Sequence, residues 1–353
     1  MGVNLSGYGI HAGDWRAAIK SNQRHTIFVL ASFIAIYLLV GLILDLYLYS
    51  GRDSTLSLTQ LFISLVTFKI IPYATIIAGI VAIISIMVTF IFHNKLMLLG
   101  SDHREITSES AQGLEEKQLY NVVEEMKVAA GLSYIPRVYI IEANYMNAFA
   151  SGYSEKSAMV AITRGLLEKL DRDELTAVMA HELSHIRHHD IKLTLMASVL
   201  SNITLILIDI LFWNALFGGD DRGDSKRNNN LFIIILILRY VLPLLTVVLM
   251  MYLSRAREYM ADAGCVELMR NNEPLARALL KIQNDHDANQ AEYAAAYTAT
   301  PHESIRRQAY IFNPSVAGIK TQKSIADLFT THPSVADRLA AMGIKNSESN
   351  SGT

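Results

Sequence analysis

The sequence has a single cysteine, Cys265, among 353 residues. One cysteine cannot form an internal disulfide, so the chain is not a disulfide-stapled extracellular scaffold. The same shortage excludes a structural zinc site built from three or four cysteines. The 31 lysines and arginines are balanced by 33 aspartates and glutamates, which leaves a formal net charge of −2. Without an excess of positive charge the composition does not indicate a nucleic-acid-binding surface, and we expect no nucleic acid among the partners.

Charge is also scarce, because charged residues make up only 18% of the chain, against roughly 25% in a typical soluble domain. Charge is rarest in four long apolar windows, at 26–44, 70–92, 193–217 and 231–253. A helix needs about 20 apolar residues to cross the hydrocarbon core of a bilayer, so each window predicts a transmembrane helix. For the last two windows, which contain charged residues, the alternative is a pair of buried helices in a soluble domain. Their length and aliphatic density favour membrane spans.

The two charged residues of these windows lie at matching positions. Asp209 comes eight residues before Phe217, and Arg239 comes eight residues after Leu231. At about 1.5 Å per residue, both lie roughly 12 Å below the same membrane surface if the two spans are antiparallel neighbours. A lone charge at that depth costs at least ~2.5 kcal/mol on insertion scales. We therefore predict an Asp209–Arg239 ion pair, with a polar cavity or another subunit as the alternative environment of each.

Lysines and arginines near the ends of the windows are distributed unevenly. Nine lie on the side that carries both termini and five lie on the other side. By the positive-inside rule, this predicts an integral membrane protein whose termini and polar parts face the cytoplasm. The predicted organisation is a cytoplasmic tail (1–25), two transmembrane helices with a short outer loop (26–93), a first polar part (94–190), a hydrophobic hairpin (191–253), a second polar part (254–343) and a disordered tail (344–353).

The first polar part mixes helical and extended patterns, which predicts an α+β domain with a small sheet beside helices. Together with the apolar windows, this gives a mainly helical integral membrane protein with about four transmembrane helices and a small cytoplasmic α+β domain. The expected elements are a helix over 108–131 that ends at Gly131, a strand over 137–141, extended runs over 147–153 and 158–162, a short helix over 163–170, and a helix from about Glu174 capped by Asp171 or Asp173.

The last of these helices carries the sequence His181-Glu182-Leu183-Ser184-His185. Residues four apart lie on one face of a helix, so the two imidazoles can reach one zinc ion. Glu182, next to the first histidine, can contact a water on that metal without being a ligand. A chance occurrence on a polar helix is the alternative. The buried stripe expected on the same helix argues against it, because it places the histidines beside a core.

A catalytic zinc needs a third protein ligand and one open position. Just past the fourth apolar window, Glu258 and Asp262 are also four residues apart on one helical face. Glu258 can bind zinc, and Asp262 can accept the remaining N–H of a ligand histidine. The alternative is a solvated acidic face paired with Arg255 and Arg257. The HExxH sequence favours the metal site, because such a site requires a third ligand.

The segments AHELSHIRHHD and SRAREYMADAGC, separated by a hydrophobic hairpin, resemble the HtpX-type membrane zinc metalloproteases, which are relatives of the CAAX prenyl proteases. NAFASGY, AITRGLL and LFTTHPSVADRL are also similar to that family, and the resemblance covers most of 26–343. It implies a cytoplasmic zincin-like domain with one zinc ion on His181, His185 and Glu258, and Glu182 as general base. It further implies an endopeptidase of protein quality control and stress response. Residues 286–325 match no pattern that we can place.

The chemistry of such a site can be stated from general principles. Zinc lowers the pKa of bound water toward about 7 and polarises the scissile carbonyl, and Glu182 takes the proton and passes it to the leaving amine. The developing oxyanion needs a further donor, for which His332 and Arg338 are candidates that the resemblance supports. For His332 the alternative is a helix-start role beside Pro333.

The residues Asn147, Ala148 and Phe149 are candidates for substrate binding. They could form an edge strand that pairs with an extended peptide, with a plain core strand as the alternative. The predicted partners are therefore polypeptide substrates, membrane proteins in particular, and the lipid bilayer.

Two other functions stay open at this point. A prenyl-protein (CAAX) protease is the enzymatic alternative, although four apolar windows and a small polar body fit the larger CAAX architecture poorly. A membrane scaffold that keeps a structural zinc is the non-enzymatic alternative. A structural site is closed by four protein ligands, whereas this sequence offers three obvious ones. A membrane-bound zinc metalloendopeptidase is the preferred prediction.

Overall fold

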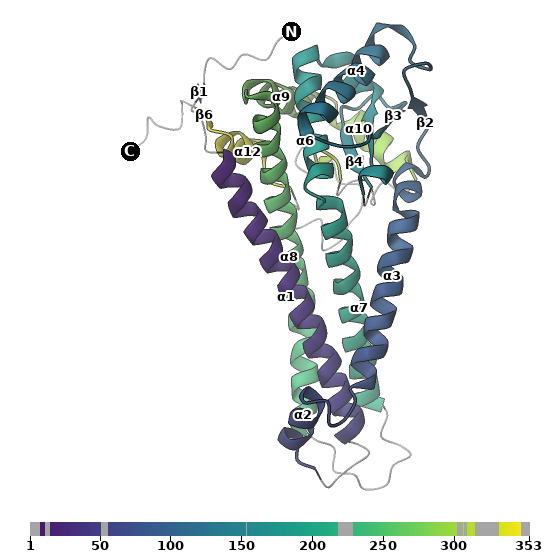
Figure 1. Ribbon diagram of the computed structural model, residues 1–353, viewed down its shortest axis with the longest axis vertical. Coiled ribbons are helices and arrows are strands. Elements are labelled where there is room, and N and C mark those ends of the chain that lie inside the picture. Colours follow the sequence, from purple (N-terminus) through teal and green to yellow (C-terminus); the bar gives the residue numbers. More distant parts are fainter. Residues whose placement is uncertain are drawn as a thin grey trace. The chain divides into compact units, whose positions relative to one another are not determined.

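The computed structural model describes residues 8–10, 15–50, 56–152, 154–217, 229–301, 306, 309–314 and 332–346. They separate into two compact units. The polar unit comprises 1–26, 90–193 and 251–353, and the apolar unit comprises 27–89 and 194–250. The elements in chain order (Figure 1) are β1 (Tyr8–Ile10), α1 (Trp15–Ser50), α2 (Leu58–Val66), α3 (Tyr73–Leu98), β2 (His103–Ile106), α4 (Gly113–Ala130), β3 (Arg137–Ile141), β4 (Ala148–Ser151), a 3-10 turn (Glu155–Ser157), β5 (Met159–Thr163), α5 (Arg164–Lys169), α6 (Arg172–Arg187), α7 (Asp190–Phe217), α8 (Asn229–Met269), α9 (Glu273–Ala288), α10 (Gln290–Ala299), α12 (Val335–Ala341) and β6 (Ile344–Asn346).

Three of the four apolar windows lie wholly within helices, and the window 70–92 is helical from Tyr73 onward. Helices α1, α3, α7 and α8 are each long and apolar enough to cross a membrane. Two of them extend well beyond their windows. Helix α1 begins at Trp15, inside the predicted cytoplasmic tail. Helix α8 continues without a break to Met269, so the boundary predicted between 253 and 254 falls inside one helix.

Within the apolar unit, the predicted ion pair between α7 and α8 is confirmed. A guanidinium nitrogen of Arg239 lies 2.8 Å from Oδ1 of Asp209. The same guanidinium lies over the ring of Phe212, 4.1 Å from its centroid, where the electron-rich face of the ring attracts a cation. Helices α7 and α8 also contribute, with α1, to a buried apolar cluster that comprises Val40, Ile43, Ile208, Leu211, Ala215, Leu231, Ile235 and Leu242.

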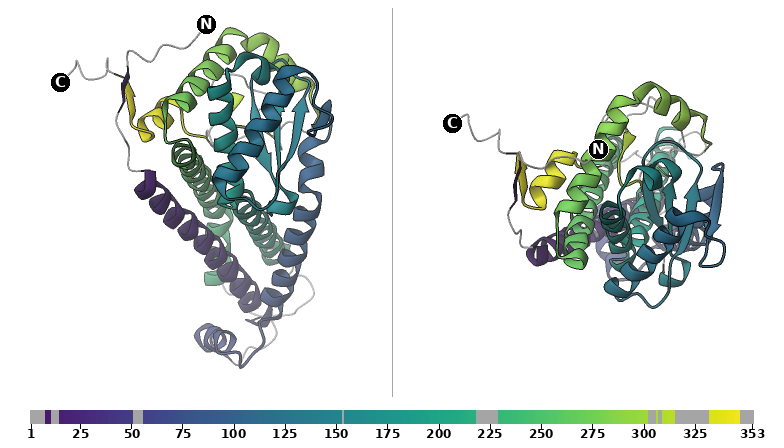
Figure 2. Two further views of the ribbon diagram at one scale, coloured as in Figure 1. Left: turned by 45° about the horizontal axis from the view of Figure 1, so that its top comes forward. Right: turned by 90° about the horizontal axis from the view of Figure 1, so that it is seen from above.

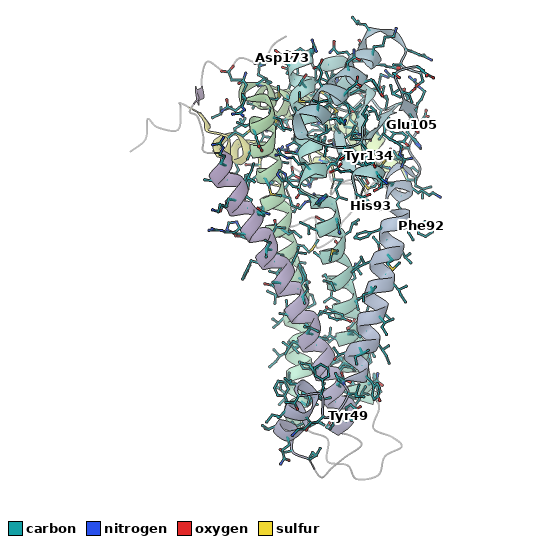
Figure 3. The ribbon with its side chains drawn as sticks, in the orientation of Figure 1. Tyr49, Phe92, His93, Glu105, Tyr134 and Asp173 are labelled. Carbon is teal, nitrogen blue, oxygen red and sulfur yellow. The ribbon has the colours of Figure 1, made fainter. Side chains whose placement is uncertain are left out.

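The start of α3 is capped by a carboxylate from α1. Asp45 is almost fully buried and accepts hydrogen bonds from the backbone N–H groups of Ala74 and Thr75, each at 2.9 Å. These N–H groups have no partner inside the helix, so the carboxylate satisfies them as a capping residue does. Nearby, the hydroxyl of Tyr49 (labelled in Figure 3) donates to the carbonyl of Ile71 at 3.0 Å. The two contacts fix the connection between α1 and α3.

The polar unit contains a four-stranded sheet in the order β2-β3-β5-β4. Strands β3 and β5 are parallel, whereas β2 and β4 are antiparallel to their neighbours, so both edge strands run against the centre. Helix α6 packs against β4 and β5 and also against α4 and α9 (Figure 2). This confirms the predicted α+β pattern and places α6 between the sheet edge and two helices.

The ends of the helices follow local rules. Asp171 caps α6 by accepting a hydrogen bond from the N–H of Glu174, whose own side chain accepts from the N–H of Asp171. This reciprocal pair is a capping box, so Asp171 and not Asp173 is the cap. Helix α4 ends at Gly131 as predicted, with a left-handed φ of 71° that suits glycine, although it begins at Gly113 and not at 108.

A second, two-stranded sheet joins segments from the two ends of the chain. Tyr8 pairs with Asn346 and Ile10 with Ile344 in antiparallel register. The prediction that 344–353 is a disordered tail is therefore wrong for 344–346, because pairing with β1 supplies the backbone hydrogen bonds that the polar sequence alone did not suggest. Residues 347–353 lie outside the described part of the chain.

Candidate metal centre

The HExxH sequence lies in the buried middle of α6. His181 and Glu182 are fully buried, and His185 is 5% exposed. The helical spacing brings the two histidines together, with their Nε2 atoms 3.2 Å apart and their rings perpendicular. Two ring nitrogens that face each other in this way can both point lone pairs at a shared ion.

The third member of the cluster is Glu258, which comes from α8. Its Oε2 lies 3.7 Å from Nε2 of His181, and its Oε1 lies 3.7 Å from Nε2 of His185. Among the described residues, the ligand atoms of these three side chains all lie within 4.8 Å of one another. The structure thus brings together the three residues that the sequence motifs select, across 77 positions of the chain (258 − 181).

The spacing and the donor types fit a metal ion. Two nitrogens at 2.0–2.1 Å from a tetrahedral zinc are about 3.3 Å apart, close to the 3.2 Å between the two histidines. Two imidazoles and one carboxylate are a ligand set that zinc accepts with a fourth position open. In addition, Oε2 of Glu258 is buried without a hydrogen bond in the described structure. A buried carboxylate oxygen of this kind needs a cation or a donor. The three residues therefore form a possible metal site.

Each histidine is oriented by a carboxylate at its other nitrogen. Nδ1 of His181 lies 3.0 Å from Oδ1 of Asp262, and Nδ1 of His185 lies 2.9 Å from Oδ2 of Asp190. Both carboxylates are buried. A carboxylate at Nδ1 holds the proton there and leaves Nε2 free for a metal, the arrangement that usually supports metal-binding histidines. Asp262 thus occupies the place expected of it.

Asp190 was not identified from the sequence. Helix α6 ends at the cap residue His188, and His189 takes a left-handed φ of 56° before α7 begins at Asp190. This sharp turn brings the carboxylate of Asp190 back against α6, beside His185. The signal that could have found it is a carboxylate at the start of a helix, one short turn after a ligand histidine.

Glu182 has the environment of a proton acceptor. Both carboxylate oxygens are buried, and neither makes a hydrogen bond among the described residues. Burial raises the pKa of Glu182 to about 7, because the charged form loses its hydration. A carboxyl group that titrates near neutral pH can both take up and release a proton, as a general base must.

Arg338 reaches the cluster from α12 and is itself fixed by Asp262. Its Nε donates to Oδ2 of Asp262 at 2.9 Å and one terminal nitrogen donates to Oδ1 at 2.6 Å, a two-point contact between planar groups. The other terminal nitrogen donates to the carbonyl of Ile311 at 2.7 Å and lies 3.7 Å from Oε2 of Glu258. Asp262 therefore orients both a histidine and this guanidinium.

His332 also lies beside the cluster. Its Nδ1 is 3.6 Å from Oε1 of Glu258, and neither ring nitrogen makes a hydrogen bond to the described residues. The expected alternative, a helix-start role, falls to another residue, because Ser334 caps α12 by accepting from the N–H of Asp337. Pro333 precedes this cap and is not the first helical residue. The imidazole of His332 is thus available to the site.

The edge strand is present but it is not free. Strand β4 is the last strand of the sheet, with Ala148 and Phe149 in it and Asn147 just before it. Phe149 forms an antiparallel bridge with Tyr310, and the N–H of Ile311 donates to the carbonyl of Ala148 at 2.9 Å. Part of region 286–325 therefore already pairs with the predicted edge strand. The role of these three residues in substrate binding stays a prediction.

Comparisons with known proteins agree with this geometry. The model of the family described as "Peptidase family M48" matches residues 113–344. The chain is 39% identical to a "Protease HtpX homolog" of Helicobacter pylori (strain Shi470), over 93% of this chain and 98% of that protein. It is 32% identical to a "Protease HtpX homolog" of Listeria monocytogenes serotype 4a (strain HCC23), over 91% and 96% respectively. The crystal structure of S. mikatae Ste24p covers 75% of this chain and 57% of that one, at 20% identity and a TM-score of 0.45.

The family match spans β3, β4 and β5, helix α6, the end of α8 and α12, and it includes His181, His185 and Glu258. The relatives extend the likeness through the apolar helices as well. The chain therefore belongs to peptidase family M48 and, within it, to the HtpX-type integral membrane metalloproteases.

Proposed function

We propose that this protein is a zinc-dependent endopeptidase that hydrolyses misfolded or membrane polypeptides on the cytoplasmic side of the plasma membrane, as part of protein quality control. One observation carries the proposal. The buried carboxylate of Glu182, which accepts no hydrogen bond from the described residues, stands next to a convergent His181–His185–Glu258 cluster. A scaffold with a structural metal has no use for such a group, because burying an unsatisfied carboxylate costs stability.

In this proposal His181, His185 and Glu258 hold one zinc ion, and Asp262 and Asp190 hold the two imidazoles in the orientation that binds it. Zinc, when bound, supplies an acidified water and a polarised scissile carbonyl. Glu182 accepts the proton and delivers it to the leaving amine, for which a pKa of about 7 is well suited.

The oxyanion that forms on the substrate needs a donor. Arg338 already donates to Asp262 and Ile311, whereas the buried His332 has both nitrogens without hydrogen bonds in the described structure. We therefore assign His332 as the donor that meets the oxyanion. Arg338 has a positioning role through its contact with Asp262. Its terminal nitrogen that donates to the carbonyl of Ile311 is the group that binds a carbonyl of the substrate peptide.

The decisive experiment separates metal binding from catalysis. We expect Glu182→Gln to keep a full complement of zinc, measured by atomic absorption on the detergent-solubilised protein, and to lose casein cleavage by at least about 100-fold. The matched control is Asp173→Asn, the same carboxylate-to-amide change at an exposed position of the same helix (Figure 3), which should retain the parental rate.

Two outcomes would contradict the proposal in different ways. Cleavage by Glu182→Gln at the parental rate would remove Glu182 from the role of base. A zinc-loaded parent that cleaves no casein at any concentration would favour the scaffold with a structural metal.

A further inference from the structure

The residues that pair with the edge of the sheet form a short extended segment, Tyr310–Asn313. Tyr310 faces Phe149 in an antiparallel bridge, and the N–H of Ile311 donates to Ala148. The inner side of β4 is paired with β5. The segment therefore uses the row of backbone groups that an added peptide strand would use.

A side chain extends this pairing beyond the end of the strand. The amide of Asn147 donates from Nδ2 to the carbonyl of Phe312 at 2.9 Å and accepts from the N–H of Phe312 at Oδ1, at 3.3 Å. An amide side chain that meets both groups of one residue acts as a further backbone partner. These hydrogen bonds involve only main-chain groups of the segment, so any extended peptide could form them whatever its sequence.

The segment also reaches the metal cluster. The carbonyl of Ile311 accepts from Arg338, whose guanidinium lies 3.4 Å from Nδ1 of His181 and 3.7 Å from Oε2 of Glu258. One side chain therefore separates this peptide group from two of the proposed ligands. Among the described residues, four hydrogen bonds involve the main chain of Ile311 and Phe312.

The side chains of the segment are held in an aromatic cluster. Tyr310, Ile311 and Phe312 are at most 3% exposed. The hydroxyl of Tyr310 lies 3.2 Å from that of Tyr145, and the ring of Phe312 lies 4.6 Å from that of His286. This packing gives the segment an affinity for the edge that a substrate would have to exceed.

We propose that Tyr310–Asn313 is an autoinhibitory segment, which occupies the peptide-binding edge at Asn147, Ala148 and Phe149 and must leave before a substrate can bind. The proposal rests on the proposed function. One row of backbone donors and acceptors cannot serve two strands at once, so segment and substrate compete. The apparent affinity for substrate is then reduced by the fraction of molecules in which the edge is free.

A reversible lock on the segment tests this directly. Because the Ile311–Ala148 hydrogen bond flanks them, Phe149 and Tyr310 form a non-hydrogen-bonded antiparallel pair, whose Cα atoms lie about 4.5 Å apart. A disulfide spans that distance. The double variant Phe149→Cys with Tyr310→Cys is therefore purified as the full chain in detergent, oxidised with oxidised glutathione and assayed on β-casein, before and after reduction by a phosphine.

We expect the oxidised double variant to cleave β-casein at least about tenfold more slowly than the same protein after reduction. The two states share both substitutions, so the lost aromatic rings do not enter the comparison. Each single cysteine variant, treated identically, should show no difference between oxidised and reduced states, because Cys265 is buried. Equal rates for the locked and the reduced double variant would show that the segment is a permanent strand, and would overturn the proposal.

A second readout does not depend on catalysis. In the Glu182→Gln variant, hydrogen exchange at the amides of Ile311 and Phe312 should speed up several-fold when β-casein is added at saturation, with binding followed by fluorescence anisotropy. The amide of Ala161, in the central strand β5 and fully buried, serves as the internal control. Bound β-casein with unchanged exchange at both amides overturns the autoinhibitory role. If the reduced protein binds β-casein and shows the expected faster hydrogen exchange but never cleaves β-casein, the proposed protease function is wrong and the segment's displacement by peptide is not contradicted.

Discussion

Oδ2 of Asp190 lies 2.9 Å from Nδ1 of His185, across the turn that separates α6 from α7. The contact ties the first residue of an apolar helix to a proposed zinc ligand. Asp262 makes the equivalent contact with Nδ1 of His181, so each of the two imidazoles is held by its own carboxylate.

Asp190→Ala should weaken zinc binding by about 10- to 100-fold, because the imidazole of His185 loses the group that fixes its orientation and its proton. Competition against a fluorescent zinc chelator measures this. Asp190→Glu should restore part of the affinity, whereas Asp173→Asn is the control outside the site. An Asp190→Ala protein with parental zinc affinity would limit Asp190 to a role at the start of α7.

Removal of the metal should abolish cleavage reversibly. Dialysis against a chelator is expected to bring casein cleavage to background, and one equivalent of zinc per chain should restore it. His185→Ala and Glu258→Ala should lose both the bound zinc and the activity, in contrast to Glu182→Gln, which keeps the zinc. If Glu258→Ala retained stoichiometric zinc, the third ligand would have to be another residue.

The Asp209–Arg239 pair should stabilise the apolar unit. Each single change to alanine leaves one charge without its partner at membrane depth, so both Asp209→Ala and Arg239→Ala should lower the midpoint of thermal unfolding in detergent. A double-mutant cycle should give a coupling of roughly 0.5–3 kcal/mol. The charge swap Asp209→Arg with Arg239→Asp should recover part of the loss. Additive single effects with no coupling would show that the ion pair contributes nothing to stability.

The orientation inferred from the charge bias can be tested with reporter fusions. Fusions after Gly51 and after Asp224 should report the outside, and fusions after Gly100 and at Thr353 should report the cytoplasm. Alkaline phosphatase and a cytoplasm-active reporter, fused at the same sites, give complementary readouts. A cytoplasmic signal at Asp224 alone would mean that α7 and α8 form a hairpin that does not cross the bilayer.

Much of the fold could be predicted from local sequence. The apolar windows lie in α1, α3, α7 and α8 because a run of about 20 apolar residues is stable as a helix in hydrocarbon. The spacing of His181 and His185 could be interpreted because helical periodicity places both on one face of α6, where their Nε2 atoms lie 3.2 Å apart. The Asp209–Arg239 pair followed from counting residues, because antiparallel neighbours share a depth.

The remaining features depend on contacts between distant parts of the chain. The left-handed turn at His189 decides that Asp190 reaches His185, and no spacing rule specifies that turn. Whether β4 offers an open edge depends on Tyr310, 161 positions after Phe149 (310 − 149), and on the Asn147 amide that meets Phe312. Residue types and helical periods are local properties, so the sequence by itself determined which side chains form the possible metal site. Which strands pair, and which segment covers an edge strand, depends on how all segments of the chain compete for the same backbone donors and acceptors. Only the tertiary structure decides the outcome of that competition.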